Sequence, residues 1–229
     1  MQTVDFDACL FDMDGTLIDT EPYWIEAESL LVEQHGGRWS AKQGLALVGS
    51  GLYGTADALK RAGVDMEPRA IIDWLSEYVR DKMTEQMPWR PGAVELIRTL
   101  HDAHIPCALV TMSFRSTAQA LSDAMSTELG TEAFQVVVTG EDVTYPKPHP
   151  EAYLQAAKSL GVEIGRCVAF EDSGHGAASA FSSGAITIGL PLHVDIPEHS
   201  VHVFWETLAN KTPADIHEVA AAAAAGRTA

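Results

Sequence analysis

Cysteine is scarce in this chain of 229 residues, which contains only Cys9, Cys107 and Cys167, far apart in the sequence. Each of the three lies within a short apolar run, and none belongs to a CxxC or Cys/His spacing, which argues against a zinc site. An odd number of widely spaced cysteines also argues against a disulfide framework. We therefore expect three buried free thiols.

Positive charge is also scarce, because 15 lysines and arginines face 32 aspartates and glutamates, for a formal net charge of −17. Such a surface repels the phosphates of nucleic acids and the headgroups of anionic membranes, so neither is expected as a partner. An anionic substrate would therefore need a locally positive site, made by a metal ion or by a well-placed lysine.

Long apolar runs are missing as well, since no run approaches the roughly 20 residues that a membrane-spanning helix requires. Residues 1–7 are acidic, which is the opposite of the basic start of a secretory signal. The proportions of hydrophobic residues, 46%, and charged residues, 21%, are those of an ordinary globular protein. We expect a soluble, cytoplasmic protein.

Five short apolar runs recur along the chain, and most are followed by a turn and a helical pattern. They are nearly continuous in apolar character rather than alternating, which predicts buried strands of a parallel sheet. The expected fold is therefore α/β, with a Rossmann-like parallel sheet. The five predicted strands are residues 8–11, 107–110, 134–138, 167–170 and 185–188.

The gap between the first and second predicted strands is much longer than a normal crossover, and it lacks strand-like runs. Glycine breaks divide it into helical patterns. We predict an inserted helical-bundle domain at residues 18–87 and an α/β core domain from residues 1–17 and 88–229. The helices expected in the insertion cover residues 21–35, 41–47, 54–62 and 68–86.

Chemically suggestive side chains follow the predicted strands at their carboxyl ends, where open α/β sheets bind ligands. The first strand is followed by Asp12 and Asp14, and Gly15 permits a sharp turn there. Two carboxylates at this spacing suit a nucleophile and an acid/base neighbour that share a metal ion. By itself the pair is weak evidence, because most such acids lie in solvated loops.

The other strands add groups that suit a phosphate and a metal ion. Thr111 ends the second strand, where a hydroxyl and backbone amides can hold phosphate oxygens. Lys147, between two prolines, could neutralise a nucleophilic carboxylate and a phosphate together. Glu171 and Asp172 follow the fourth strand. Oxygen ligands from Asp12, Asp172 and a backbone carbonyl suit the octahedral preference of Mg²⁺.

Together these segments resemble the four ordered motifs of the haloacid dehalogenase-like hydrolase superfamily, over nearly the whole chain. The inserted helices resemble that family's helical cap, and residues 19–22 resemble the cap entrance of the subgroup with sugar-phosphate phosphatases and β-phosphoglucomutase. The resemblance implies a magnesium-dependent phosphatase for a small phosphorylated metabolite. The matching segments are residues 11–17, Thr111, residues 147–148 and residues 170–173.

The resemblance also implies roles for the two acids of the first motif. Asp12 would attack phosphorus and bind Mg²⁺ through its other oxygen. Asp14 would protonate the leaving alcohol, then activate water, and lend its backbone carbonyl to the metal.

For the remaining motifs, the resemblance makes Thr111 a phosphate-binding hydroxyl and Lys147 the charge-balancing lysine. Asp172 would be a metal ligand, with Glu171 supporting it directly or through water. Phosphoryl transfer depends on this kind of charge neutralisation and positioning.

The resemblance leaves two other activities of the same superfamily to consider, dehalogenation and phosphate transfer within a sugar phosphate. Dehalogenases lack an acid equivalent to Asp14, so dehalogenation is not expected. A mutase shares all four motifs and stays open, although the mutase branch has a histidine where this chain has Trp24 and an arginine where this chain has Ser50 and Gly51 after Gly49. These departures remove groups that would hold a second phosphate, so net hydrolysis is preferred.

A different class of function is a catalytically silent binding protein on the same fold. The intact acids, threonine and lysine argue against it, because a non-enzyme has no need for an electrostatically costly acid cluster. A hinge near residues 18–20 and 87–90 would suit a monomer that opens and closes. The natural substrate stays open. Substrate contacts are expected from Glu21, Trp24, Gly49, Ser50, Tyr53, Met112, Ser113 and Arg115.

Overall fold

The computed structural model describes residues 6–48 and 51–227 of the chain. The chain folds as two compact units, of which the larger is formed by Met1–Ile18 and Trp89–Ala229 and the smaller by Asp19–Pro88. The predicted boundaries, after residues 17 and 87, each lie one residue before those of the structure.

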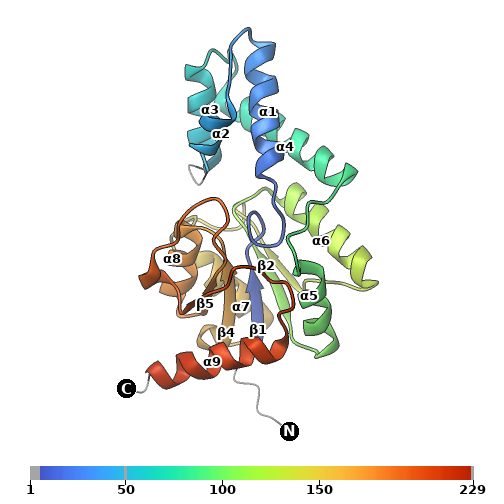
Figure 1. Ribbon diagram of the computed structural model, residues 1–229, viewed down its shortest axis with the longest axis vertical. Helices are drawn as coiled ribbons and strands as arrows, with labels where there is room; N and C mark the ends of the chain where they lie inside the picture. Colours follow the sequence, from blue (N-terminus) through green and yellow to red (C-terminus); the bar gives the residue numbers. More distant parts are fainter. Residues whose placement is uncertain (1–5, 49–50, 228–229) are drawn as a thin grey trace. The chain divides into compact units, whose positions relative to one another are not determined.

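A six-stranded parallel sheet forms the centre of the larger unit, with the strand order β3-β2-β1-β4-β5-β6 (Figure 1). The chain adds β2 and β3 on one side of β1 and then returns to place β4 on its other side. This arrangement confirms the predicted parallel-sheet α/β fold. The strands are β1 (Ala8–Phe11), β2 (Cys107–Val110), β3 (Val136–Val138), β4 (Cys167–Glu171), β5 (Ile186–Gly189) and β6 (Val203–Phe204).

Four strands differ from the sequence prediction. β4 ends at Glu171 rather than at residue 170, and β5 spans Ile186–Gly189 rather than residues 185–188. β6 was not predicted, because a strand of two residues is too short to show any pattern. β3 begins at Val136 rather than at residue 134, since residues 134 and 135 lead into the strand, where the Gln135 side chain accepts a hydrogen bond from the Cys107 backbone N–H.

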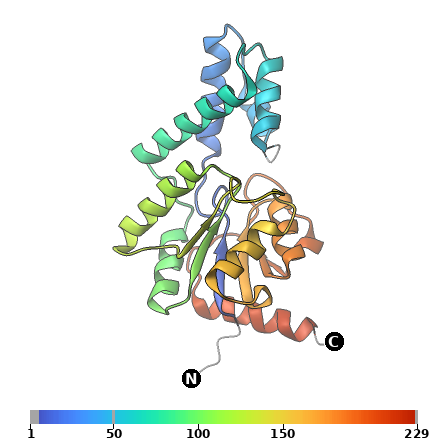
Figure 2. The same cartoon turned by 180° about the vertical axis from the view of Figure 1, so that it is seen from behind.

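Helices cover both faces of this sheet (Figures 1 and 2). On one face, the alanine-rich side of α7 packs on alternate residues of β1, β2 and β4 in a continuous buried cluster, with α8 beside it. Small alanines let α7 approach the strands closely. The helices of this unit are α5 (Ala93–Asp102), α6 (Arg115–Leu129), α7 (Glu151–Leu160), α8 (Gly174–Ser183) and α9 (Pro213–Arg227).

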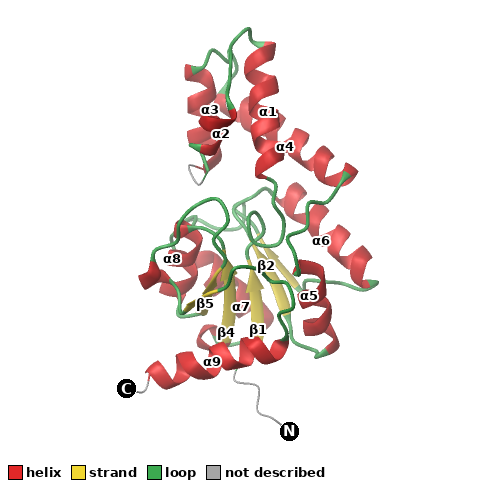
Figure 3. Ribbon diagram, in the orientation of Figure 1, coloured by secondary structure: helices red, strands yellow, loops and turns green. Residues whose placement is uncertain are grey.

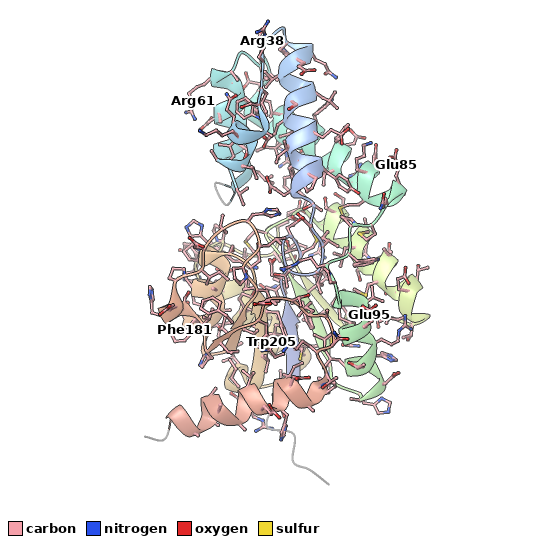
Figure 4. The ribbon with its side chains drawn as sticks, in the orientation of Figure 1. Arg38, Arg61, Glu85, Glu95, Phe181 and Trp205 are labelled. Carbon is pink, nitrogen blue, oxygen red and sulfur yellow. The ribbon has the colours of Figure 1, made fainter. Side chains whose placement is uncertain are left out.

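Aromatic rings pack on the opposite face of the central strands. Phe11 of β1 stacks on Phe170 of β4, with ring centroids 4.5 Å apart. Trp205, labelled in Figure 4, lies 5.9 Å from the Phe170 ring, centroid to centroid. These contacts fix the two strands immediately before the acidic residues that follow them.

The smaller unit is a bundle of helices, and its described residues between 19 and 88 form helices and loops but no strand (Figure 3). Its core is aliphatic, with side chains such as Leu31, Leu59, Ile72 and Leu75 fully buried. The helices are α1 (Glu21–Gln34), α2 (Ala41–Leu45), α3 (Gly51–Arg61) and α4 (Pro68–Glu85). Among the described residues of this unit, four helices correspond to the four predicted ones; three of them begin at the predicted residue, and the other ends differ by one to three residues.

The three cysteines are free and buried, as predicted. Burial raises the pKa of the Cys107 thiol to about 12, so this side chain behaves as a small apolar group. Within residues 6–48 and 51–227, no helix combines the length and the apolar character that crossing a membrane would require.

Candidate active site

The carboxyl ends of β1 and β4 bring three acidic side chains together. Phe11 of β1 pairs with Phe170 of β4, and the Asp12 backbone N–H donates to the Phe170 carbonyl at 3.1 Å. This register places Asp12 beside Glu171 and Asp172. Each of the three carboxylates offers an oxygen, and these oxygens lie within 4.8 Å of one another. All three side chains are buried.

Lys147 is buried against this cluster. Its ammonium group donates to Asp12 Oδ1 at 2.7 Å, to Glu171 Oε1 at 2.7 Å and to the Val110 carbonyl at 2.9 Å. Burial alone lowers the pKa of Lys147, but the charges and hydrogen bonds of Asp12 and Glu171 outweigh burial and raise that pKa. Lys147 is therefore positively charged, and all three of its N–H groups are directed at named oxygens.

The acidic cluster carries more negative charge than Lys147 can balance. Burial raises the pKa of Asp172, and the neighbouring charges of Asp12 and Glu171 raise it further. For Glu171, burial and the charge of Asp12 raise the pKa to about 7 against the lowering effect of Lys147. Buried carboxylate oxygens that repel one another in this way fit a small hard cation, and Mg²⁺ prefers such oxygen ligands.

Gly15 makes room for this arrangement. Its backbone has a φ of +78°, and a Cβ atom at this position would lie 2.0 Å from Asp172 Oδ2. The turn after β1 therefore needs glycine both for its left-handed conformation and for the close approach of the Asp172 carboxylate.

Asp14 is half-buried on the same loop, and its partner comes from the end of β2. The Ser113 hydroxyl donates to Asp14 Oδ2 at 2.7 Å. The Ser113 backbone N–H in turn donates to the Thr111 hydroxyl at 3.0 Å, and Thr111 is almost completely buried. The loop after β2 thus joins Thr111, Ser113 and Asp14 in one chain of hydrogen bonds.

The other two candidate contacts from this loop have protein partners. Met112 packs against the buried cluster under α7, and its sulfur accepts the Lys147 backbone N–H at 3.4 Å. Arg115 begins α6, and its guanidinium forms an ion pair with Asp142 while its backbone N–H donates to Glu141 at 2.8 Å. Their contacts with a substrate stay predictions.

The remaining candidates belong to the smaller unit. Glu21 and Trp24 lie in the first turns of α1, where both are half-buried. Tyr53, in α3, is 64% exposed. Gly49 and Ser50 lie outside the described residues. The role of these side chains in binding a substrate stays a prediction.

Sequence reasoning missed two buried polar residues that touch the site. The Tyr153 hydroxyl of α7 donates to Glu171 Oε1 at 2.6 Å. The Arg90 guanidinium donates to the carbonyls of Gly15 and Leu190, the latter at 3.0 Å. For Tyr153, the available signal in the sequence was a polar group within an apolar helical pattern. For Arg90, it was a position at the edge of the insertion.

The chain is similar to a known protein family and to proteins with assigned activities. The family model "haloacid dehalogenase-like hydrolase" matches residues 6–184, which is more than half of the chain. Fructose-1-phosphate phosphatase YqaB of Escherichia coli is 30% identical over 80% of this chain and 95% of its own length. Hexitol phosphatase A of the same species is 32% identical over 82% of this chain and 84% of its own length.

Among solved structures, a protein of Thermotoga maritima provisionally named a β-phosphoglucomutase is 25% identical, with a TM-score of 0.70. The alignment covers 93% of this chain and 97% of that one. The matches confirm the family expected from the sequence motifs, and the phosphatases among the relatives agree with the expected enzyme class, a phosphoric monoester hydrolase. This chain belongs to the haloacid dehalogenase-like hydrolase family.

Proposed function

We propose that this protein is a magnesium-dependent phosphatase that hydrolyses a small, sugar-phosphate-like monoester through an aspartyl-phosphate on Asp12. The observation that carries the proposal is the position of Asp12, whose carboxylate is held by Lys147 at 2.7 Å and lies beside the buried acids Glu171 and Asp172. A nucleophilic carboxylate needs this combination of a fixed orientation and nearby positive charge.

In the first step, a carboxylate oxygen of Asp12 attacks phosphorus while the bond from phosphorus to the ester oxygen breaks. Asp14 gives its proton to the departing oxygen, so the alcohol leaves neutral. Ser113 suits this role of Asp14, because its hydroxyl can donate to the carboxylate and accept from the carboxylic acid. Lys147 offsets the charge gathered between Asp12 and the phosphoryl group.

In the second step, Asp14 takes a proton from water, the water oxygen attacks phosphorus, and the acyl-phosphate bond breaks. Inorganic phosphate leaves, and the Asp12 carboxylate is restored. Asp12, Asp172, Glu171 and the backbone carbonyl of Asp14 are the groups proposed to hold Mg²⁺. When bound, Mg²⁺ supplies positive charge that reduces the repulsion between the nucleophile and the phosphate oxygens.

The substrate class rests on the relatives. The names of the two Escherichia coli proteins specify a fructose phosphate phosphatase and a hexitol phosphatase. A phosphorylated sugar or sugar alcohol is therefore the first choice for this chain, and we propose contacts from Glu21, Trp24 and Ser50 of the smaller unit.

Phosphate release from p-nitrophenyl phosphate and from a panel of sugar and sugar-alcohol phosphates tests the proposal. The purified protein is assayed with Mg²⁺ and again after treatment with EDTA. We expect release that needs Mg²⁺ and favours at least one sugar phosphate. Absence of turnover over the whole panel would favour the binding protein considered above.

A sugar phosphate mutase is the second candidate, favoured by the likeness to the Thermotoga maritima structure. One observation argues against a mutase: the chain has Trp24 at the position where the mutase branch is expected to carry a histidine. ³¹P NMR can measure both outcomes: interconversion of sugar phosphates without release of inorganic phosphate would identify the mutase.

A further inference from the structure

Tyr153 is a fully buried phenol in an otherwise apolar layer. It lies on α7, where Ala152, Ala156 and Ala157 complete the face that packs on the sheet. A buried hydroxyl costs free energy unless it forms a hydrogen bond. The Tyr153 hydroxyl forms that bond with Glu171 Oε1, at 2.6 Å.

Glu171 is in turn held on both of its oxygens. Oε1 accepts from Tyr153 and also from the Lys147 ammonium, at 2.7 Å. Oε2 lies over Gly176 of α8, where a Cβ atom would be 1.8 Å from it, and the Ser173 hydroxyl is 3.5 Å away. The Glu171 side chain is completely buried, so it has little freedom beyond what these contacts allow.

Lys147 connects this arrangement to Asp12. Its ammonium lies 5.1 Å from the centre of the Tyr153 ring, and the same nitrogen bridges Glu171 Oε1 and Asp12 Oδ1. Tyr153 therefore contacts both the acid and the lysine that surround Asp12. If the Tyr153 hydroxyl were removed, Lys147 would be the remaining donor of a short hydrogen bond to Glu171 Oε1 among the bonds described above.

We propose that Tyr153 is a positioning residue for the metal site, which fixes the Glu171 carboxylate so that it stays in the cluster with Asp12 and Asp172. The inference rests on the proposed function, because it assumes that this cluster binds Mg²⁺. Hydrogen-bond partners of metal-site carboxylates contribute about 10- to 100-fold to metal affinity in other proteins. We expect an effect at the lower end of that range, since Lys147 continues to hold Glu171.

The test is the Mg²⁺ affinity of Tyr153→Phe, measured by isothermal titration calorimetry on the whole protein without substrate. The variant keeps the ring in the core and removes only the hydroxyl. Tyr78→Phe, which removes a hydroxyl from α4 of the smaller unit, is the matched control. We expect the Mg²⁺ dissociation constant to be about tenfold larger for Tyr153→Phe than for the wild type, and to be unchanged for Tyr78→Phe.

Thermal unfolding in EDTA separates positioning from a purely structural role. A fall in the metal-free midpoint of Tyr153→Phe with an unchanged Mg²⁺ affinity would overturn the inference. The same substitution in a Glu171→Gln background provides a second test, since Tyr153 is proposed to act through Glu171. If Tyr153→Phe lowers the Mg²⁺ affinity as much in the Glu171→Gln background as it does in the wild-type background, the inference is also overturned.

Failure of the inference and failure of the proposed function give different results. If the wild-type protein does not bind Mg²⁺ at all, the proposed function is overturned. If the wild type binds Mg²⁺ and Tyr153→Phe binds it equally well, only the role of Tyr153 is overturned.

Discussion

The Ser113 hydroxyl donates to Asp14 Oδ2 at 2.7 Å, which joins the end of β2 to the loop that follows β1. Ser113 was expected to contact the substrate, and in the structure its hydroxyl faces the proposed general acid. A hydrogen bond to a charged carboxylate contributes about 1.5–3 kcal/mol when it is buried and well aligned. The contact therefore offers a way to hold Asp14 in one orientation.

Ser113→Ala is predicted to lower kcat about tenfold and to leave KM nearly unchanged, because it removes the partner of Asp14 rather than a substrate contact. Steady-state kinetics on the best substrate of the panel measures both constants. Ser182 is an exposed residue whose hydroxyl bonds within α8, and Ser182→Ala is expected to change neither constant. A raised KM with an unchanged kcat would instead support the original expectation of a substrate contact.

Asp12→Asn is predicted to abolish turnover while the fold is retained. The amide keeps the size of the side chain and its oxygen can still accept from Lys147, but it is a far weaker nucleophile than a carboxylate. Phosphate release measures the loss, and far-ultraviolet circular dichroism checks the fold. Appreciable residual activity in a preparation free of wild-type protein would contradict the assigned nucleophile.

Gly15→Ala is predicted to destabilise the larger unit and to weaken Mg²⁺ binding, since the new Cβ atom would lie 2.0 Å from Asp172 Oδ2. Gly130→Ala is the matched control. Gly130 has nearly the same backbone conformation, φ +75° against +78°, but nothing lies within 4 Å of a Cβ atom there. Both variants carry the backbone cost of about 1 kcal/mol or more for a left-handed alanine.

The difference between these two alanine variants isolates the contact with Asp172. Thermal unfolding in EDTA and calorimetric titration with Mg²⁺ provide the measurements. Equal Mg²⁺ affinity in Gly15→Ala and Gly130→Ala would show that the close approach of Asp172 to the turn has no part in metal binding.

Much of this site could be predicted because its residues follow buried strands. The apolar runs before Asp12 and Glu171 are continuous and of strand length, and parallel strands bring their carboxyl ends to the same edge of a sheet. Neighbouring motifs at that edge therefore had to converge. The positions of the helices in the smaller unit could be predicted for a similar reason, since glycines separate long helical patterns.

The contacts of individual side chains could not be predicted in this way. Tyr153 looks like one more core residue of an amphipathic helix, and nothing local shows that its hydroxyl meets Glu171. The pairing of Ser113 with Asp14 depends on the register of two strands that are far apart in the sequence. Such partners are set by tertiary packing rather than by local pattern.

Glu28→Gln is predicted to stabilise the smaller unit at neutral pH. Glu28 is buried in α1 and accepts a hydrogen bond from Trp39 Nε1 at 3.0 Å. Burial raises the pKa of Glu28 above its ordinary value, and the Trp39 bond only partly opposes this. The contribution of Glu28 to stability is therefore complete below the unfolded pKa of 4.5 and is lost as the pH rises through the folded pKa.

A glutamine stays neutral at every pH and can still accept from Trp39. The variant should therefore unfold at a higher temperature than the wild type at pH 7, and the difference should disappear near pH 4. Thermal unfolding over this pH range measures it. Glu33→Gln changes an exposed side chain on the same helix and serves as the control. If the difference in unfolding temperature between Glu28→Gln and the wild type does not change with pH, the raised pKa of Glu28 is not its cause.

Arg90→Lys is predicted to lower the free energy of unfolding of the larger unit by about 2 kcal/mol. The Arg90 side chain is buried, and its guanidinium donates to the carbonyls of Gly15 and Leu190, which lie in separate loops. Its backbone N–H also donates to the Leu17 carbonyl, at 2.9 Å. Both bonds come from one terminal nitrogen, Nη1, of the guanidinium. A lysine would keep the charge, but its side chain is one atom shorter and its ammonium lacks the fixed planar geometry of the guanidinium.

Arg98→Lys is the matched control for this substitution, because Arg98 also donates its guanidinium to a backbone carbonyl, that of Glu128 at 2.8 Å, but in an exposed position. Water can replace a donor at an exposed carbonyl, whereas the buried carbonyl of Gly15 would lose its partner in a loop that also carries Asp14. Urea unfolding monitored by circular dichroism compares the two variants. If Arg90→Lys costs no more than Arg98→Lys, the guanidinium does not fix the loop that carries Asp14 and Gly15.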